Sequence, residues 1–335
     1  MDAELRSAAV PRWRGEPGRL EVWYATLSDP VTRAGLWVHC ETVAPTPSVG
    51  GPAYGHGWAT WFPAEGPPRT ERFGPCPVEP GSEPAWFRIA DAHVALQELT
   101  GRAGTLAWDL HWKNTGRPLW TFPRVAWERD LLPGAQVVLA PTADFTGSVT
   151  VGDAAHRLDG WRGAVAHIYG RGNAKRWGWI HADLGDGDVL EVVTAVSHTP
   201  GLRRLPPIAF VRFRLDGKDW PPMGLPSLWM RTTLARSPAR QSRPQRAEPP
   251  ALGVRHWQLE GRIGGRNALI RVDQPVDRCV SLGYTDPDGA TAVCTNTEQA
   301  DVHVELGERR WSVLGHAEVG LRGAAAPPVR EGISS

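Results

Sequence analysis

The sequence predicts an all-β protein made of two antiparallel β-barrels in tandem. The chain contains 37 Gly and 31 Pro among its 335 residues, a composition that favours many turns and short strands over long helices. Short apolar or alternating runs recur between these turn residues, as in the strands of a sheet. From residue 208 onward about eight such runs fit into roughly 115 residues, the size of a small closed barrel. We predict one barrel over residues 15–204, a second over residues 205–322, and a disordered tail over residues 323–335.

The composition indicates a reduced, cytoplasmic protein. The net charge of +1 implies no nucleic-acid partner, and no run of about 20 apolar residues is present that would span a membrane. The N-terminus has no apolar segment of a secretory signal. None of the four cysteines has CxxC spacing, although Cys279 and Cys294 lie on neighbouring predicted strands and would be able to pair in an exported protein.

The N-terminal half begins with a loose leader at residues 1–15 and continues as a series of strands. Residues 20–27 and 36–43 are apolar runs on either side of a turn, which is typical of a hairpin. Residues 86–99 fit a helix by their period and a strand pair by their flanking turn, so both remain open. The further strands expected in this half are residues 57–62, 69–73, 106–112, 136–140, 144–151 and 154–158.

The strand at residues 106–112 alternates cleanly, with Trp108 on its apolar face. Asp109 and His111 share the opposite face, where they can lie side by side. Such a pair is able to act as an oriented base. The alternative is a satisfied polar pair on a strand surface, which is the commoner role of ion pairs of this kind.

The stretch at residues 166–191 organises the rest of the chain. Trp177, Trp179, His181 and Asp183 fall on one face of an extended strand, while the other face is small and apolar. Such a strand is typical of a wall between a core and a ligand cavity. The Asp-Gly pair at residues 186–187 predicts a hairpin turn. The alternative is that the two indoles are ordinary core rings and the polar pair is a solvated strand end.

The C-terminal part carries a second series of predicted strands. A polar, Arg- and Pro-rich segment at residues 235–251 interrupts it, and this segment has too little apolar surface to order itself. The strands expected here are residues 189–196, 208–215, 227–234, 255–262, 268–272, 279–284, 291–294, 301–306 and 311–321.

Motifs for cofactors and metals are missing from the sequence. The Gly-Arg-Gly at residues 170–172 lacks the third glycine of a dinucleotide fingerprint, and there is no P-loop, GxSxG or HExxH. His167, His181 and His198 converge only if the fold brings them together. We therefore predict neither a cofactor nor a bound metal.

Two motifs carry a resemblance to a known family. Residues 163–170 read G-x-x-x-H-x-x-G, and residues 177–187 read W-x-W-x-x-x-x-L-x-D-G. A Gly-x-x-Glu-x-Gly pattern closes the chain at residues 315–320. Together they resemble the carotenoid 1,2-hydratase (hydroxyneurosporene synthase)/AttH-like family. The resemblance implies two lipocalin-like, calycin-type barrels that hold a ligand in a barrel mouth or between the barrels, and activities such as water addition to a carotenoid double bond or cyclisation of polyketides.

Two positions depart from the family pattern. Ala166 and Gly178 stand where hydratases of the family often carry acids. If those acids supply protons, hydration loses more from this change than cyclisation or plain binding, for which shape and a few polar anchors suffice.

The sequence thus predicts a protein that binds a small apolar, isoprenoid- or polyketide-like molecule in a Trp-lined cavity and hydrates, isomerises or cyclises it. The alternatives are a non-catalytic lipid or pigment carrier, or an interaction module that uses the Arg-rich segment. The oligomeric state stays open. The residues expected to act are His167 and His181 as donors or general acid–base groups, Trp108, Trp177 and Trp179 as apolar walls, Arg171 as an anion anchor, and Asp183 as a further ligand contact.

Overall fold

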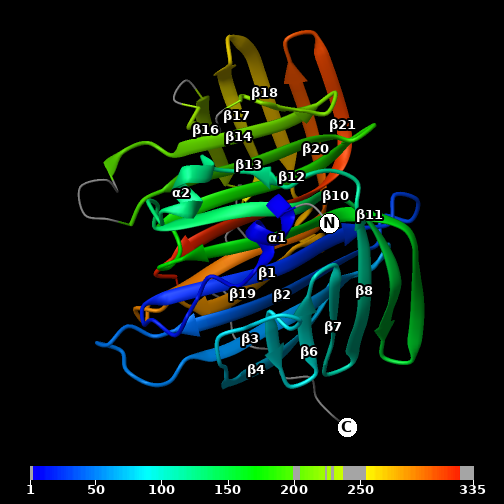
Figure 1. The fold of residues 1–335 in the computed structure, drawn as a ribbon. Helices are drawn as coiled ribbons and strands as arrows, with labels where there is room; N and C mark the ends of the chain where they lie inside the picture. The colour runs from blue at the N-terminus through cyan, green and yellow to red at the C-terminus, as the bar shows by residue number, and fades with distance from the viewer. Residues whose placement is uncertain (1–2, 199–203, 223–224, 228–229, 237–253, 325–335) are drawn as a thin grey trace, which may run out of the picture.

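The structure, a computed structural model, describes residues 3–198, 204–222, 225–227, 230–236 and 254–324. Most of these residues lie in two antiparallel sheets, which Figure 1 shows one above the other. Most of the Arg-rich segment and of the expected disordered tail lies outside the described residues. Two short helices, α1 (Ala3–Ala9) and α2 (Arg124–Glu128), and a 3₁₀ turn at Val276–Arg278 accompany the sheets.

The first sheet has the strand order β4-β3-β2-β1-β11-β10-β8-β7-β6-β5, with β9 also paired to β10. Its strands are β1 (Arg19–Ser28), β2 (Gly35–Ala44), β3 (Tyr54–Phe62), β4 (Arg69–Pro77), β5 (Phe87–Ile89), β6 (Ala92–Ala95), β7 (Glu98–Ala103), β8 (Leu106–Asn114), β9 (Leu119–Trp120), β10 (Gly134–Val151) and β11 (Ala154–Gly170). The segment that the sequence left open between helix and strands is therefore the strand series β5, β6 and the start of β7.

The second sheet has the strand order β15-β14-β13-β12-β21-β20-β18-β17-β16, with β19 also paired to β20. Its strands are β12 (Arg176–Gly185), β13 (Asp188–Val196), β14 (Ile208–Leu215), β15 (Lys218–Trp220), β16 (Met230–Arg236), β17 (Val254–Ile263), β18 (Arg266–Asp273), β19 (Val280–Thr285), β20 (Thr291–Leu306) and β21 (Arg309–Arg322).

Each sheet curls until its two ends meet. In the first sheet, a Cβ atom added to Gly55 of β3 would lie 2.7 Å from Ile89 of β5, so the two edges pack together. In the second sheet, the Arg266 guanidinium of β18 lies 5.4 Å from the ring centre of Trp220 on β15. The predicted fold class, two antiparallel β-barrels in tandem, is confirmed.

The two barrels meet through strands that are buried on both faces. In β1, Trp23 and Leu27 enter the core of the first barrel, whereas Val22 and Tyr24 point the other way and pack toward Trp179 of the second sheet. This double burial explains why the sequence of β1 reads as a nearly continuous apolar run rather than an alternating one.

The sheets divide the chain earlier than the predicted boundary between residues 204 and 205. The predicted first barrel includes β12 and β13, but these strands belong to the second sheet, where Trp177 of β12 pairs with Gly320 of β21. The change falls between Gly170, the end of β11, and Arg176. Its cause is a pairing between strands far apart in the chain, which no local sequence pattern encodes.

The N-terminal leader is ordered, contrary to expectation. Helix α1 packs into the first barrel and buries Leu5, Ala8 and Ala9, and Trp13 follows them into the same core. The indole nitrogen of Trp120 donates to Glu4 and fixes the start of the helix. The segment is stabilised by burial against the barrel, which compensates for its short length.

Two further expectations concern membranes and thiols. None of the helices in the described part of the chain has the length and apolar character that crossing a membrane requires. The four cysteines are free, so Cys279 and Cys294 do not form the disulfide considered for an exported protein.

Candidate active site

A cavity of about 380 Å³ lies between the two barrels. Its volume is in the range of small-molecule sites, roughly 300–1,000 Å³. Most of its lining is apolar or aromatic, and both barrels contribute. The residues on which the argument depends are Val22, Tyr24, Trp37, His39, Glu41, Trp58 and Ile168 of the first barrel, and Trp177, Trp179, Val193, Phe210, Tyr284, Asn296 and Glu318 of the second.

Alternation along the strands places these side chains on the cavity face. In β2, Trp37, His39 and Glu41 are two residues apart and therefore share one face. In β12, Trp177 and Trp179 face the cavity, while Ile180 and Ala182 enter the core of the second barrel. Strand β12 thus forms a wall with one cavity face and one core face.

Glu318 is the acid of the second barrel. The Trp177 Nε1 donates to its Oε1 at 2.6 Å, and the Cys294 thiol and the Asn296 amide also bond to the carboxyl group. Burial raises the pKa of Glu318 to about 7, despite these donors, and the nearby Glu298 adds to the effect. Glu318 is therefore partly protonated at neutral pH and can serve as a proton donor.

Glu41 is the acid of the first barrel. His39 Nε2 lies 3.2 Å and His56 Nε2 3.5 Å from the same carboxyl oxygen of Glu41. Burial raises the pKa of Glu41 to about 7, although His56 and Arg72 oppose the shift. Burial, assisted by Arg72, lowers the pKa of His39 to about 3. At neutral pH His39 is therefore neutral, and its Nε2 is placed to share a hydrogen bond with Glu41.

Two tyrosines complete the polar part of the lining. Burial and the surrounding acidic groups raise the pKa values of Tyr24 and Tyr284 well above the ordinary value of 10. Both phenols stay protonated over the physiological range, so each is a neutral hydrogen-bond donor. Among the acidic groups that act on Tyr284 are both Glu41 and Glu318.

Of the residues expected from the sequence, Trp177 and Trp179 line the cavity. His181 lies behind them, where its Nδ1 is 2.9 Å from Glu191 and its other ring nitrogen has no hydrogen-bond partner among the described residues. The same Glu191 accepts a hydrogen bond from Trp179 Nε1 at 2.7 Å. His181 is therefore connected to the wall but does not reach the cavity.

His167 lies inside the first barrel, away from the cavity lining. Its Nδ1 is 2.8 Å from the Ala8 carbonyl oxygen, its Nε2 is 2.9 Å from Glu21, and its ring stacks on Trp23 with centroids 4.7 Å apart. Both ring nitrogens are engaged, so His167 ties the N-terminal segment to β1 and β11.

The remaining expected residues also lie outside the cavity lining. Trp108 is in the core of the first barrel against Phe73. Arg171 is exposed and pairs with Asp130 at 2.7 Å. Asp183 pairs with Arg162 at 3.3 Å.

The oriented base considered at Asp109 and His111 is a surface ion pair. The two groups lie 2.9 Å apart, and both side chains are about half exposed.

The two acids were not among the expected site residues. Glu318 stands in the closing Gly-x-x-Glu-x-Gly pattern, and Glu41 follows His39 at strand spacing in an otherwise apolar run. An acidic residue within an otherwise apolar strand indicates a buried functional acid, because charged groups are rarely buried without a partner.

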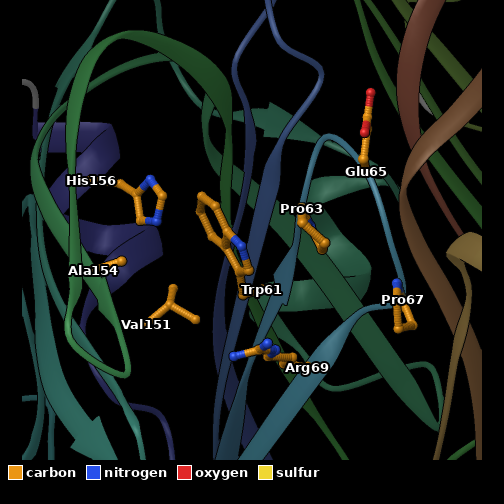
Figure 2. A pocket seen from close by; sticks show the side chains of 8 residues that line it. All are labelled: Trp61, Pro63, Glu65, Pro67, Arg69, Val151, Ala154 and His156. Atoms are coloured by element: carbon orange, nitrogen blue, oxygen red, sulfur yellow. The ribbon is translucent and has the colours of Figure 1, made fainter.

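A second hollow of about 260 Å³ lies on the first barrel alone (Figure 2). Trp61 stacks on His156 there at 4.7 Å, and Glu65 and Arg69 stand at its rim. This hollow contains no buried acid, since Glu65 is exposed. The cavity between the barrels is therefore the better candidate site.

The described residues contain no group of three or more His, Cys, Asp or Glu side chains placed to hold a metal ion. The side chains of the cavity lining that can exchange protons are the two carboxyl groups, the imidazoles of His39 and His198, and the phenols of Tyr24 and Tyr284.

Comparison with known proteins identifies the family of the chain. Residues 83–321 match the tocopherol cyclase-like family. The chain belongs to this family. It is 72% identical over 334 residues to the uncharacterized proteins Rv0493c and MT0513 of two Mycobacterium tuberculosis strains, and the match covers 99% of this chain and 95% of each relative.

Solved structures of low sequence identity share the fold. Kievitone hydratase from Nectria haematococca superposes with a TM-score of 0.60 at 12% identity, over 93% of this chain and 91% of that one. CghA with Sch210972 gives 0.60 at 15% identity, over 92% and 89%. An AttH-like protein from Nitrosomonas europaea gives 0.57 at 13% identity, over 95% and 96%.

Proposed function

We propose that this protein is an enzyme that adds an O–H group across a carbon–carbon double bond of a small, largely apolar molecule, isoprenoid- or polyketide-like, in the cavity between the barrels. The observation that carries the proposal is Glu318, a cavity-facing carboxyl group that retains a proton near neutral pH inside an aromatic lining. A carboxylic acid in such surroundings is a suitable general acid.

The other lining groups fit the steps that follow. Protonation of the double bond by Glu318 leaves a carbocation, which the indoles of Trp177 and Trp179 stabilise. An oxygen then attacks the cation and loses its proton to Glu41, with His39 beside it at 3.2 Å. The two acids belong to different barrels, so each barrel supplies one end of the proton transfer.

Cyclisation fits this cavity better than hydration. In cyclisation the attacking oxygen belongs to the substrate, and the cavity walls hold it against the double bond. An apolar, Trp-lined cavity also keeps water away from a carbocation. The family is named for a cyclase, whereas kievitone hydratase is named for a hydration, so both outcomes belong to one reaction class.

The experiment uses deuterium as the reporter. The purified protein is incubated in D₂O with geranylgeranyl hydroquinone, geranylgeraniol or a farnesyl phenol, and products are analysed by mass spectrometry. One carbon-bound deuterium in an isomer of the substrate indicates cyclisation, and the added mass of water indicates hydration. The matched control is Glu65→Gln, the same chemical change at an exposed position of the second hollow.

The outcomes separate an enzyme from a carrier. Deuterium uptake that is lost in Glu318→Gln and kept in Glu65→Gln supports the proposal. Saturable quenching of the tryptophan fluorescence with no deuterium uptake would instead favour a non-catalytic lipid or pigment carrier.

A further inference from the structure

The first wall of the cavity has a polar side and an apolar side. The strand register places Glu41 of β2 beside Val22 of β1, and Val22 beside Ile168 of β11. On the neighbouring rung, His39 lies beside Tyr24, and Tyr24 beside Ala166. Polarity therefore decreases across this wall from β2 to β11.

The second wall shows the same change independently. Its register runs from Asn296 of β20 through Glu318 of β21, Trp179 of β12 and Val193 of β13 to Phe210 of β14. The polar residues stand on β20 and β21, and the residues on β13 and β14 are apolar.

The polar sides of the two walls face each other. Tyr284 of β19, which pairs with β20, lies 5.7 Å from the Trp58 ring and 6.4 Å from the His39 ring, and Figure 1 shows β19 beside β2. At the other end, Phe122 contacts Phe210 with ring centroids 4.6 Å apart. The two acids of the cavity thus lie at one end, and the other end is lined mainly by apolar groups, with Gln136 of β10 beside Ile168 as a neutral polar exception.

The polar end offers no cation to a ligand. Among the described lining residues there is neither Lys nor Arg, and the charged groups are the acids Glu41 and Glu318. The guanidinium of Arg72 lies over Trp58 and donates to the Gly283 carbonyl oxygen rather than lining the cavity. A buried anion would therefore stay unpaired beside two acids, which is costly.

We propose that the cavity selects amphiphiles with an uncharged hydroxyl or carbonyl head, held between Glu41, Tyr284 and Glu318, and rejects anions that carry the same chain. The inference rests on the proposed function in taking this cavity as the substrate site. It names the head group that the site accepts. A neutral oxygen accepts hydrogen bonds from the phenol of Tyr284 and from the acids when these are protonated. The chain of the ligand lies along Ile168, Val193 and Phe210.

The test compares two molecules with one chain and different heads. Geranylgeraniol and geranylgeranoic acid are titrated into the full-length protein at pH 8, with tryptophan fluorescence and calorimetry as readouts. We expect the alcohol to bind at least tenfold more tightly, equivalent to about 1.4 kcal/mol. Glu41→Gln is expected to reduce the ratio of the affinities for the alcohol and the acid, because it removes one of the two repelling charges. Glu65→Gln is expected to leave this ratio unchanged.

A second experiment uses the wild-type protein alone. Geranylgeranyl sulfate stays ionised across the working range, so any change in its affinity with pH reports the charge of the cavity. We expect its binding to strengthen between pH 8 and pH 6, as Glu41 and Glu318 take up protons. The other charged or titratable groups beside Glu41 are His39, His56, Arg72 and Asp286, and the one beside Glu318 is Glu298.

The outcomes separate this inference from the proposed function. If the acid binds as tightly as the alcohol, or sulfate binding does not change with pH, the head-group selectivity is refuted and the catalytic proposal stands. If neither the alcohol nor the anions quench the fluorescence, the cavity is not a site for such molecules and both proposals fail.

Discussion

Two regions of this molecule contain the same kinds of side chain but differ in how those side chains are bonded. Inside the first barrel, His167, Glu21 and Trp23 are packed together, and between the barrels His39, Glu41 and Trp58 are packed together. In each region an imidazole stacks on an indole, with centroids 4.7 Å apart inside the barrel and 4.0 Å apart at the cavity. In each region an imidazole nitrogen also lies near a buried carboxyl group.

The difference lies in how fully the polar atoms are satisfied. Glu21 accepts backbone N–H groups of Arg12 and Trp13, at 2.5 and 3.1 Å, in addition to His167. The other ring nitrogen of His167 lies 2.8 Å from the Ala8 carbonyl oxygen, so both nitrogens of the imidazole are engaged. This cluster has no hydrogen-bonding capacity left for a ligand, whereas Glu41 and His39 face open volume. Residue types alone do not mark a site; unsatisfied groups beside a cavity do.

The largest effect that we expect from a change in either region is on the catalytic turnover at the cavity. Glu318→Gln keeps the shape and removes the transferable proton, so we expect deuterium uptake to fall by about 10²- to 10⁴-fold. At pH 5, where Glu318 is still protonated in the folded protein, the free energy of unfolding should change by less than about 1 kcal/mol, because Trp177 can still donate to the amide oxygen. Mass spectrometry measures the first quantity and urea denaturation the second. A variant that retains full turnover would remove Glu318 from the mechanism.

The next effect is on stability. Glu21→Ala leaves the buried His167 without its carboxyl partner and also removes the acceptor of the Arg12 and Trp13 N–H groups, so we expect a loss of about 3–5 kcal/mol in the free energy of unfolding. The matched control is Asp109→Ala, which breaks an exposed pair of the same kind and should cost about 0–1 kcal/mol. Urea denaturation of both variants checks the prediction. Equal losses would show that the barrel cluster is no more important than a surface pair.

A smaller effect is the dependence of stability on pH. The pKa of Glu318 is about 7 in the folded protein, above its ordinary value of 4.5, so the folded state binds more protons than the unfolded chain between these values. The free energy of unfolding therefore falls as the pH rises through this window, by up to about 1.4 kcal/mol per pH unit. Denaturation at pH 5 and pH 8, taken as the difference between wild type and Glu318→Gln, isolates this group. His39, whose lowered pKa has the opposite sign, is present in both proteins and cancels.

The smallest effect is expected at the second hollow. Glu65→Gln changes an exposed side chain that belongs to neither cluster, so we expect a change in stability within about 0.5 kcal/mol and no change in ligand affinity. Fluorescence titration with geranylgeraniol measures the affinity. A clear loss of binding would mean that the hollow in Figure 2, rather than the cavity between the barrels, receives the ligand.

Local patterns in the sequence predict most of the strands and one wall of the site. The alternation around Trp177 and Trp179 predicts a strand with a core face and a cavity face, and β12 has both. Gly187, with a φ of +81°, stands in the expected turn after Asp186. These features depend on residues close together in the chain, where side-chain period and turn chemistry decide the outcome.

The partners across the chain could not be predicted in the same way. His167 stands in the G-x-x-x-H-x-x-G motif of residues 163–170. Its role, however, depends on Ala8 and Glu21, which reach it only through α1 and the pairing of β1 with β11. Glu41 and Glu318 form one site only because the outer faces of two barrels meet. Pairings of this kind are non-local, so a single sequence shows the acids without showing what they face.

The pairing of β12 with β21 also has a consequence for how the protein is made. As the chain leaves the ribosome, the first barrel cannot close until β11 has been made and can pair with β1. The second barrel cannot close until β21 has been made and can pair with β12. During that interval Trp177 and Trp179 remain without the strand that supports them, on a chain whose apolar surface is exposed to self-association. The ligand site therefore forms only after β21 has been made, and a chain truncated before Gly320 would expose its aromatic wall to chaperones rather than to a substrate.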